Sequence, residues 1–214
     1  MGDGPASEEW LDPEHVGAYR ARAGEFPHRL EGEGVLLEHV PRDVGRVLDL
    51  GTGDGRVVAL LQEDRPQMRS VALDFSEPML AAARERFAGD TAVEIVEHDL
   101  ADPLPASLGC FDAVVSSLAI HHLHDGRKRA LYREAFDLLE AGGVFLNFDH
   151  VASPTERLHA AFFDAIRVAR EDEDPSDRTV LVETQLEWLR EIGFEDVDCH
   201  WKWLEMALLA GIKP

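Results

Sequence analysis

The chain has 214 residues, of which 45% are hydrophobic and 29% are charged, and its 42 acidic and 21 basic side chains give a formal net charge of −21. This composition predicts one globular domain, and no apolar run approaches the roughly 20 residues that a membrane helix needs. A strongly acidic surface repels phosphate backbones, so nucleic acid is not expected as a partner, and neither is a membrane.

The N-terminal segment MGDGPASEEW is acidic and lacks the apolar core of an export signal. The two cysteines, Cys110 and Cys199, lie far apart and have no metal-ligand spacing, which is typical of reduced thiols. Together these features predict a cytoplasmic protein.

Residues 1–40 are predicted to be mainly helical. The stretch from Ser7 to Ala23 predicts one or two short helices, with Pro13 at the start of the second one. A further segment from Pro27 to near Val40 has a partial apolar face at helical spacing.

The stretch RVLDLGTGDGRVVALL, residues 46–61, combines a short apolar run, a glycine-rich turn and a second apolar run at helical spacing. The first run predicts a strand buried on both faces, and Asp49 interrupts it. A buried carboxylate is costly unless a partner stabilises it. The position of Asp49 at the end of the strand therefore predicts a cationic or hydrogen-bonding ligand there.

Glycines occupy alternate positions in this turn, at Gly51, Gly53 and Gly55. Without side chains they allow positive φ angles and the close approach of a ligand, and the following helix points its free N–H groups at the same place. The fingerprint of dinucleotide-binding proteins would need a glycine where this chain has Arg56. This difference disfavours a nicotinamide cofactor.

A second strand is predicted at Ser70–Phe75 and a third at Val93–Val96. Asp74 lies at the end of the second strand, where a carboxylate can accept hydrogen bonds from both ribose hydroxyls of a nucleoside cofactor. Ser76 follows as the cap of a helix with an acidic residue and a proline in its first turn. The pattern supports an adenosyl cofactor.

The fourth predicted strand, Phe111–Ser117, leads into the segment LAIHHLHD, which contains three histidines. Imidazole is a common ligand of transition metals. However, His121 and His122 are adjacent and would point apart in a strand or a helix, and the chain has neither cysteine partners nor the HExxH spacing. No metal site is predicted.

The remaining elements follow from apolar spacing, and they comprise helices at Gly126–Glu140, Thr155–Arg170 and Val180–Ile192, a strand at Val144–Phe148, and two last strands around Trp201 and Trp203. The predicted buried face of the first of these helices is made by Ala130, Leu131, Ala135, Leu138 and Leu139. That of the second is made by Leu158, Ala161, Phe162, Ala165, Ile166 and Ala169.

Two charged segments are interpreted as solvated surface. Arg127, Lys128 and Arg129 form a compact basic cluster, which is typical of an exposed helix face. The acidic residues Glu171–Asp177 are interpreted as a solvated linker, with the hinge of a mobile lid as the alternative.

Four features, in this order, resemble the class I S-adenosylmethionine-dependent methyltransferases that act on small molecules: Asp49 with the three glycines, Asp74, Asp99, and the strand with its histidine loop. The resemblance extends from about Val40 to the C-terminus. It implies an α/β fold with a Rossmann-like seven-stranded sheet, an antiparallel C-terminal hairpin and helices on both faces. It further implies an N-terminal helical cap (1–40) over the cofactor cleft of a methyltransferase domain (41–214).

The resemblance also implies a site. The cofactor would be S-adenosyl-L-methionine, held by Asp49, Gly51, Thr52, Gly53, Asp74, Phe75, Met79, Asp99, Leu100 and Ser116. His121 is the first candidate for a catalytic base, His122 the second and Asp149 a distant third, while His150 is a further pocket candidate. Tyr19, Arg22 and Arg29 are candidates for contacts with the acceptor.

The expected function is methyl transfer to a small-molecule substrate. A tRNA-modifying enzyme of the same fold, a nicotinamide-dependent oxidoreductase and a binding protein without activity are the alternatives. The acceptor atom and the choice between a monomer and a homodimer do not follow from the sequence.

Overall fold

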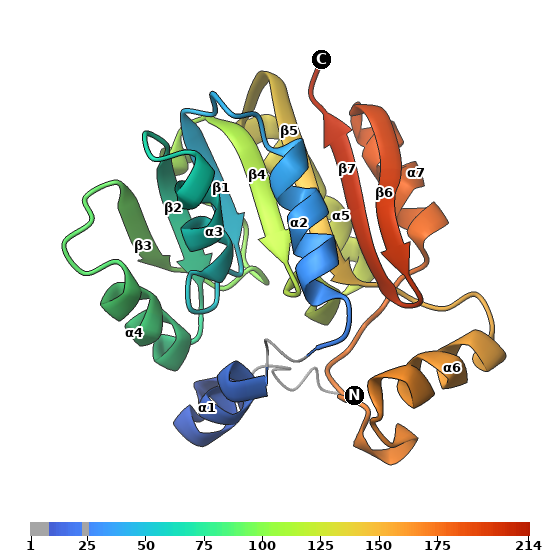
Figure 1. The fold of residues 1–214 in the computed structure, drawn as a ribbon. Helices are drawn as coiled ribbons and strands as arrows, with labels where there is room; N and C mark the ends of the chain where they lie inside the picture. The colour runs from blue at the N-terminus through green and yellow to red at the C-terminus, as the bar shows by residue number, and fades with distance from the viewer. Residues whose placement is uncertain (1–8, 23–25) are drawn as a thin grey trace.

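A computed structural model describes residues 9–22 and 26–214 of the chain (Figure 1). Seven strands form one sheet in the order β3-β2-β1-β4-β5-β7-β6, which confirms the predicted fold class. The strands are Arg46–Leu50 (β1), Arg69–Asp74 (β2), Val93–Glu97 (β3), Phe111–Ser117 (β4), Leu139–His150 (β5), Glu195–Trp203 (β6) and Met206–Ile212 (β7).

Strand β7 is the reversed strand of the sheet. It runs antiparallel to both β5 and β6, while β1 to β5 pair in parallel. After β3 at one edge the chain returns to place β4 beside β1, so the direction of strand succession changes between these two strands. Ligands of open α/β sheets bind at such a switch point, outside the carboxyl ends of the strands.

The helices are Pro13–Arg22 (α1), Arg29–His39 (α2), Arg56–Asp64 (α3), Glu77–Arg86 (α4), Asp125–Leu138 (α5), Glu156–Ile166 (α6) and Val182–Ile192 (α7). Short 3-10 turns occupy Glu9–Leu11 (η1), Ala106–Leu108 (η2), Ile120–His122 (η3) and Arg170–Asp172 (η4). Pro13 begins α1 as predicted, whereas the predicted capping residue Ser7 lies outside the described residues. Among the helices that the structure describes, none is long and apolar enough to cross a membrane.

Two apolar cores cover the two faces of the sheet, because successive side chains of a strand point to opposite sides. Leu48 and Leu50 of β1 lie in the core that α5 and α7 cover, and Val47 lies in the core that α2 and α3 cover. Figure 1 shows these two pairs of helices on opposite faces. The prediction of helices on both faces is confirmed.

Helix α2 packs on the sheet rather than standing apart from it. Leu36 and Val40 are 1% exposed within the same core as β5 and β7. At Gly32 an added Cβ would lie 2.2 Å from the ring of Phe148, so the missing side chain lets the helix approach β5 closely. The division of the chain at residue 40 stays a prediction, but α2 belongs to the core of the main sheet.

Two helices differ in detail from their predicted faces. In α5 the buried residues are Lys128, Leu131, Tyr132 and Ala135, while Ala130 is exposed. Helix α6 ends at Ile166 because Arg167 adopts a left-handed conformation, and it buries Phe162 and Phe163. Ala161, Ala165 and Ala169 are exposed, since small alanines on a short helix do not reach the core.

Candidate active site

A cavity of about 700 Å³ lies where β1, β2, β3 and β4 end at their carboxyl side. The loops after these strands form one part of its wall. The rest is contributed by η1, by residues of α1 to α5, by η3 and the segment that follows it, and by Arg178. This is the position that the switch point of the sheet predicts for a ligand.

The glycine-rich turn supplies the base of this cavity, and its three glycines have positive φ angles of 69°, 57° and 80°. An added Cβ on Gly51 would lie 2.2 Å from the Cβ of Ala119, and one on Gly55 would lie 2.4 Å from the ring of Phe87. An added Cβ on Gly53 would meet no atom closer than 3.8 Å. Gly51 and Gly55 therefore also serve the packing of the protein, whereas a side chain at Gly53 would meet only the space beside the cavity, and Gly51 and Gly53 both line that cavity.

Asp49 lies under this turn at the end of β1 and is 1% exposed. Its Oδ2 accepts a hydrogen bond from the Thr52 hydroxyl at 2.6 Å, while its buried Oδ1 has no hydrogen-bond partner. Burial raises the pKa of Asp49 to about 7, against the lowering effect of the Thr52 hydrogen bond. A buried, half-satisfied carboxylate at a cavity wall is suited to a cationic or donor group of a ligand.

Asp74 lies on the neighbouring strand and also faces the cavity. Its Oδ2 accepts the N–H of Gly53 at 2.8 Å, and its Oδ1 accepts the N–H of Ser76 at 2.9 Å. Burial raises the pKa of Asp74, although these backbone hydrogen bonds oppose the rise. Each carboxylate oxygen can accept a second bond, so the side chain is held in place for a pair of hydroxyl donors.

The other predicted cofactor residues fall into two groups. Gly51, Thr52, Phe75, Met79, Asp99 and Leu100 all line the cavity. Ser116 does not: it is 0% exposed, and its hydroxyl donates to the carbonyl of Leu50 between β4 and β1. The next residue, Ser117, lines the cavity instead, because side chains alternate along a strand.

The N-terminal elements close one side of the cavity. Tyr19 and Arg29 line it as expected, whereas Arg22 is exposed and donates to the carbonyl of Ala18. Trp10 also lines it, with its ring centroid 4.9 Å from that of Tyr19. The hydroxyl of Ser76 donates to the carbonyl of Trp10, which ties η1 to the start of α4. Nothing in the sequence pattern singled out Trp10, because an isolated tryptophan near a terminus is equally suited to core packing.

The histidine loop differs most from its prediction. The rings of His121 and His122 converge, with their centroids 3.9 Å apart, so the expectation that they point apart is wrong. The reason is that they lie neither in a strand nor in an α-helix but in the turn η3, preceded by Leu118 with a φ angle of 57°. His122 lines the cavity, while His121 is 8% exposed and lies behind the wall.

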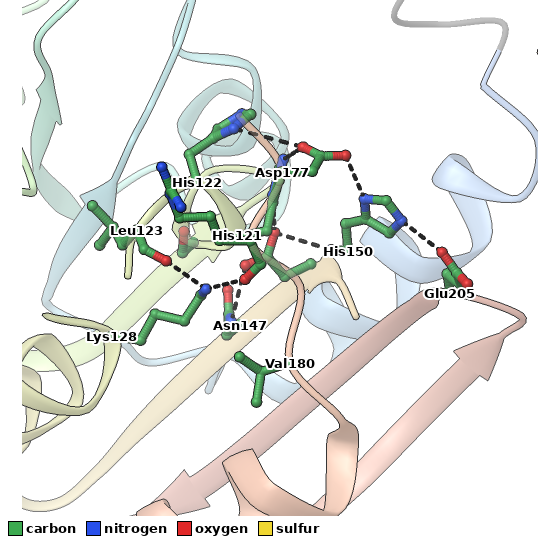
Figure 2. A network of polar contacts seen from close by, with 12 residues as sticks. His121, His122, Leu123, Lys128, Asn147, His150, Asp177, Val180 and Glu205 are labelled. Atoms are coloured by element: carbon green, nitrogen blue, oxygen red, sulfur yellow. Dashed lines mark hydrogen bonds and ion pairs between the residues drawn. The ribbon is translucent and has the colours of Figure 1, made fainter. Parts of the chain in front are cut away.

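Two carboxylates, those of buried Asp149 and half-buried Asp177, contact these rings, and Figure 2 shows Asp177 beside them. His121 Nδ1 lies 2.6 Å from Asp149 Oδ1, and His121 Nε2 lies 3.4 Å from Asp177 Oδ1. Asp149 is 2% exposed and does not line the cavity. It therefore orients His121 and is not accessible to a substrate.

Asp177 connects this cluster to a second imidazole. Its Oδ2 lies 3.1 Å from His150 Nδ1, and His150 Nε2 lies 3.0 Å from Glu205 Oε2. Burial alone would lower the pKa of His150, but the hydrogen bonds to the two carboxylates raise it to about 9. By contrast, burial and the adjacent His121 lower the pKa of His122 to about 4.

The role of Asp177 corrects the interpretation of residues 171–177 as a solvated linker. Ser176 is 6% exposed, and its hydroxyl lies 2.9 Å from His122 Nδ1. An acidic, proline-containing segment is compositionally indistinguishable from exposed linker. What distinguishes this segment from a linker is its contact with the imidazoles of His121, His122 and His150, and only the folded chain brings these to it.

The basic cluster is not a solvated helix face. Lys128 is 1% exposed and donates to the carbonyls of Leu123 and Arg178. Arg127 is paired with Glu134 at 2.5 Å, and exposed Arg129 is paired with Glu191 at 2.7 Å. The three side chains have different environments and form no common basic surface.

Unpaired polar atoms concentrate at the cavity. Seven buried side-chain nitrogen or oxygen atoms in the described part of the chain have no hydrogen-bond partner. Four of them belong to residues that line the cavity, namely Trp10 Nε1, Asp49 Oδ1, Ser117 Oγ and Arg178 Nε. Because buried polar groups are normally satisfied, the four residues give the cavity wall an unusual share of unsatisfied polar atoms.

The sheet with its reversed strand, together with Asp74 and the glycine turn at the switch point, defines a Rossmann-like protein built to bind a nucleoside cofactor. Comparison with known proteins narrows this class. A family model described as a methyltransferase domain matches residues 47–143. Over this stretch and in its fold, the chain is similar to S-adenosylmethionine-dependent methyltransferases.

Two curated relatives illustrate the similarity. The ribosomal RNA small subunit methyltransferase C of Shewanella loihica is 31% identical over 145 residues, covering 66% of this chain and 42% of the relative. The demethylmenaquinone methyltransferase of Thermus thermophilus is 38% identical over 118 residues, covering 53% of this chain and 50% of the relative. The chain thus spans about half the length of the curated relatives it matches.

Solved structures agree with this fold over nearly the whole chain. The S-adenosylmethionine-dependent methyltransferase SibL in its apo form superposes with a TM-score of 0.72 and 25% identity, covering 94% of this chain and 62% of SibL. Human N-acetylserotonin methyltransferase in complex with S-adenosylmethionine superposes with a TM-score of 0.71 and 17% identity, covering 98% of this chain and 60% of that chain. The second likeness concerns the fold alone.

Proposed function

We propose that this chain transfers a methyl group from S-adenosylmethionine to a small-molecule acceptor bound in the same cavity. The observation that carries the proposal is that Asp49, Asp74 and Asp99, from the carboxyl ends of three neighbouring strands, line one cavity of about 700 Å³. A cavity of this volume is of the size that holds a small ligand.

The cofactor residues follow the order of the strands. Asp99 and Leu100 after β3 would face the adenine, Asp74 after β2 the ribose hydroxyls, and Asp49 with Gly53 after β1 the methionine end. The unpaired Oδ1 of Asp49 fits the cationic amino group of that end. When bound, S-adenosylmethionine supplies a methyl group on a sulfonium, which is already a good leaving group.

The acceptor would lie beyond β1, on the side of β4. Ser117, His122 and Arg178 line this part of the cavity, and Trp10 and Tyr19 cover it. Positioning the acceptor against the methyl group is the largest contribution that the protein can make to such a reaction. Two aromatic rings and one guanidinium favour a compact acceptor that carries a hydrogen-bond acceptor or an anionic group.

His122 is the better candidate for a catalytic base, in place of His121. Of the residues considered for this role, it alone lines the cavity, whereas His121 and Asp149 lie behind the wall. A base has to reach the proton that it removes, and this geometric requirement comes before its pKa. His121 and Asp149 would then act by holding the loop in place.

RNA as the acceptor is the principal competing function, because one curated relative is named as a ribosomal RNA methyltransferase. Such an acceptor would need a basic surface next to the cavity. Arg127 does line the cavity, but its charge is neutralised by Glu134. The net charge of −21 further favours a small molecule.

The test is a calorimetric titration with S-adenosylhomocysteine, run beside NADH, on the wild type and on Asp74→Ala. We expect S-adenosylhomocysteine alone to bind, at least about tenfold more weakly in the variant, because hydrogen bonds to a charged group are lost. Asp137→Ala, at an exposed position on α5, is the matched control and should bind like the wild type. Thermal unfolding of each variant excludes misfolding as the cause.

Binding of NADH alone, or equal binding of S-adenosylhomocysteine to Asp74→Ala, would contradict the cofactor site. A screen for transfer of labelled methyl groups would follow, with a panel of small hydroxyl, amine and thiol compounds beside bulk tRNA. Labelling of tRNA alone would contradict the small-molecule acceptor.

A further inference from the structure

We propose that His121, His122 and Asp177 bind one divalent transition-metal ion at the acceptor side of the cavity. The proposal rests on the proposed function and gives His122 the role of a metal ligand in place of that of a base, so that the acceptor would lose its proton to water. His122 is part of the cavity wall, so an ion held by this triad would border the space in which the acceptor lies. Figure 2 shows the three side chains converging from two separate segments.

The distances between the candidate ligand atoms suit a metal better than hydrogen bonds. Asp177 Oδ1 lies 3.4 Å from His121 Nε2 and 3.6 Å from His122 Nδ1. Both separations exceed the usual hydrogen-bond range. Two atoms bound to one tetrahedral ion at zinc distances are about 3.3–3.6 Å apart. All three ligand atoms lie within 4.8 Å of one another, so closing the triad requires only a small movement.

The groups behind the triad have the arrangement that supports metal ligands. His121 offers Nε2 to the triad while its Nδ1 lies 2.6 Å from Asp149 Oδ1, and such a carboxylate fixes the tautomer and orientation of a ligating imidazole. The second oxygen of Asp177 lies 3.1 Å from His150 Nδ1. Ser176 Oγ lies 2.9 Å from His122 Nδ1, and this hydroxyl can give way by rotating about one bond.

The donor set narrows the class of metal. Two imidazoles and one carboxylate suit Zn²⁺, Fe²⁺ or Co²⁺ and are unlike the all-oxygen sites of Ca²⁺ and Mg²⁺. The separations of Asp177 Oδ1 from the two imidazole nitrogens favour Zn²⁺ among these. Three protein ligands leave a fourth position open, as in catalytic rather than structural zinc sites.

An ion there would activate a hydroxyl acceptor. The oxygen of the acceptor would coordinate the open position, which lowers its pKa and releases its proton to water. This oxygen then forms the new bond to the methyl carbon. The electron pair of the broken carbon–sulfur bond stays on sulfur, so S-adenosylhomocysteine is the product and no oxidant or reductant is consumed.

The test measures metal binding directly, on untagged full-length protein that has been treated with a chelator and dialysed. Calorimetric titration with ZnCl₂ and elemental analysis should give one equivalent per chain, and Co²⁺ should give the intense visible absorption of a four-coordinate site. Asp177→Asn and His121→Gln should each lower the affinity by at least about tenfold, and Asp149→Asn by about 10- to 100-fold.

His200→Gln is the matched control. His39 and His200 form another imidazole pair, with ring centroids 4.2 Å apart, and neither residue belongs to the triad. The proposal is overturned if the wild type binds no Zn²⁺, or if His200→Gln lowers binding as much as Asp177→Asn does. Thermal unfolding of every variant without metal establishes that it is folded.

Titration of the same samples with S-adenosylhomocysteine separates this proposal from the proposed function. Cofactor binding without metal binding would overturn the metal site and leave methyl transfer standing. Metal binding without cofactor binding would support the metal site and contradict the proposed function.

Discussion

The rings of His121 and His122, which are neighbours in sequence, lie on the same side of the chain with their centroids 3.9 Å apart. This arrangement brings both imidazoles to Asp177, a residue of a distant segment. It depends on Lys128, whose ammonium group donates to the carbonyl of Leu123 after the histidines and to the carbonyl of Arg178 after Asp177. Lys128 thereby joins the two segments that form the proposed acceptor side of the cavity.

Lys128→Met should therefore destabilise the protein despite preserving the length of the side chain. The substitution leaves two carbonyls without their donor, and we expect the free energy of unfolding to fall by about 1–3 kcal/mol in a urea titration. Arg129→Met, at the next position and on the exposed surface, should change the free energy of unfolding by less than about 0.5 kcal/mol. Equal effects of the two substitutions would show that Lys128 has no linking role.

Arg178→Met tests recognition of the acceptor. The buried Nε of Arg178 has no hydrogen-bond partner, and the residue lines the cavity. With an acceptor identified by the screen, KM for that acceptor should rise by about 10- to 100-fold, as expected for the loss of a hydrogen bond to a charged group. Affinity for S-adenosylhomocysteine should not change. A matching loss of cofactor affinity would place Arg178 at the other part of the cavity.

Asp49 should make stability depend on pH. Burial raises its pKa in the folded protein to about 7, above the value of about 3.9 for an unfolded aspartate. The folded state therefore retains this proton more strongly, and the contribution to stability is full below about pH 4 and is lost as the pH rises through 7.

Asp49→Asn removes this titration and keeps an oxygen for the Thr52 hydroxyl. At pH 8 the variant should be more stable than the wild type, by up to about 4 kcal/mol, while it binds S-adenosylhomocysteine more weakly. Urea titrations from pH 5 to about 8.5 measure the first effect and calorimetry the second. If the wild type and variant curves run parallel across this range, Asp49 does not titrate there.

Substitutions of Gly53 and Gly55 should separate an effect on cofactor binding from an effect on stability. Gly55→Ala places a Cβ 2.4 Å from the ring of Phe87 at a φ angle of 80°, and we expect a loss of about 1–3 kcal/mol in the free energy of unfolding. Gly53→Ala meets no such contact, so its stability loss should stay near about 1 kcal/mol, the cost of a left-handed alanine. The main effect of Gly53→Ala should be a lower affinity for the cofactor, measured by calorimetry. A larger loss of affinity in Gly55→Ala than in Gly53→Ala would contradict these separate roles.

Local patterns were sufficient to predict several of the residues that line the cavity. Asp49, Gly53, Asp74 and Asp99 each lie at or just after the end of a strand, and in a parallel sheet the carboxyl ends of neighbouring strands meet at one edge. Strand periodicity and the turn residues therefore determine both the fold class and the location of these groups. Ser116 was misplaced by one residue, because periodicity alone does not decide which of two neighbours on a strand faces the cavity.

The proposed acceptor side of the cavity was decided by the tertiary structure. Asp177 and Arg178 belong to a segment whose composition is that of a linker, and Lys128 to one whose charges suggest an exposed helix. Their roles depend on partners 50 or more residues away, such as Lys128 with the carbonyl of Arg178, and no local pattern encodes such a contact. The sequence by itself thus determined the sheet, its switch point and the cofactor class, since these follow from short-range alternation and turn chemistry. Only the folded chain decided which histidine faces the cavity and which carboxylates hold the pair, since those depend on long-range packing.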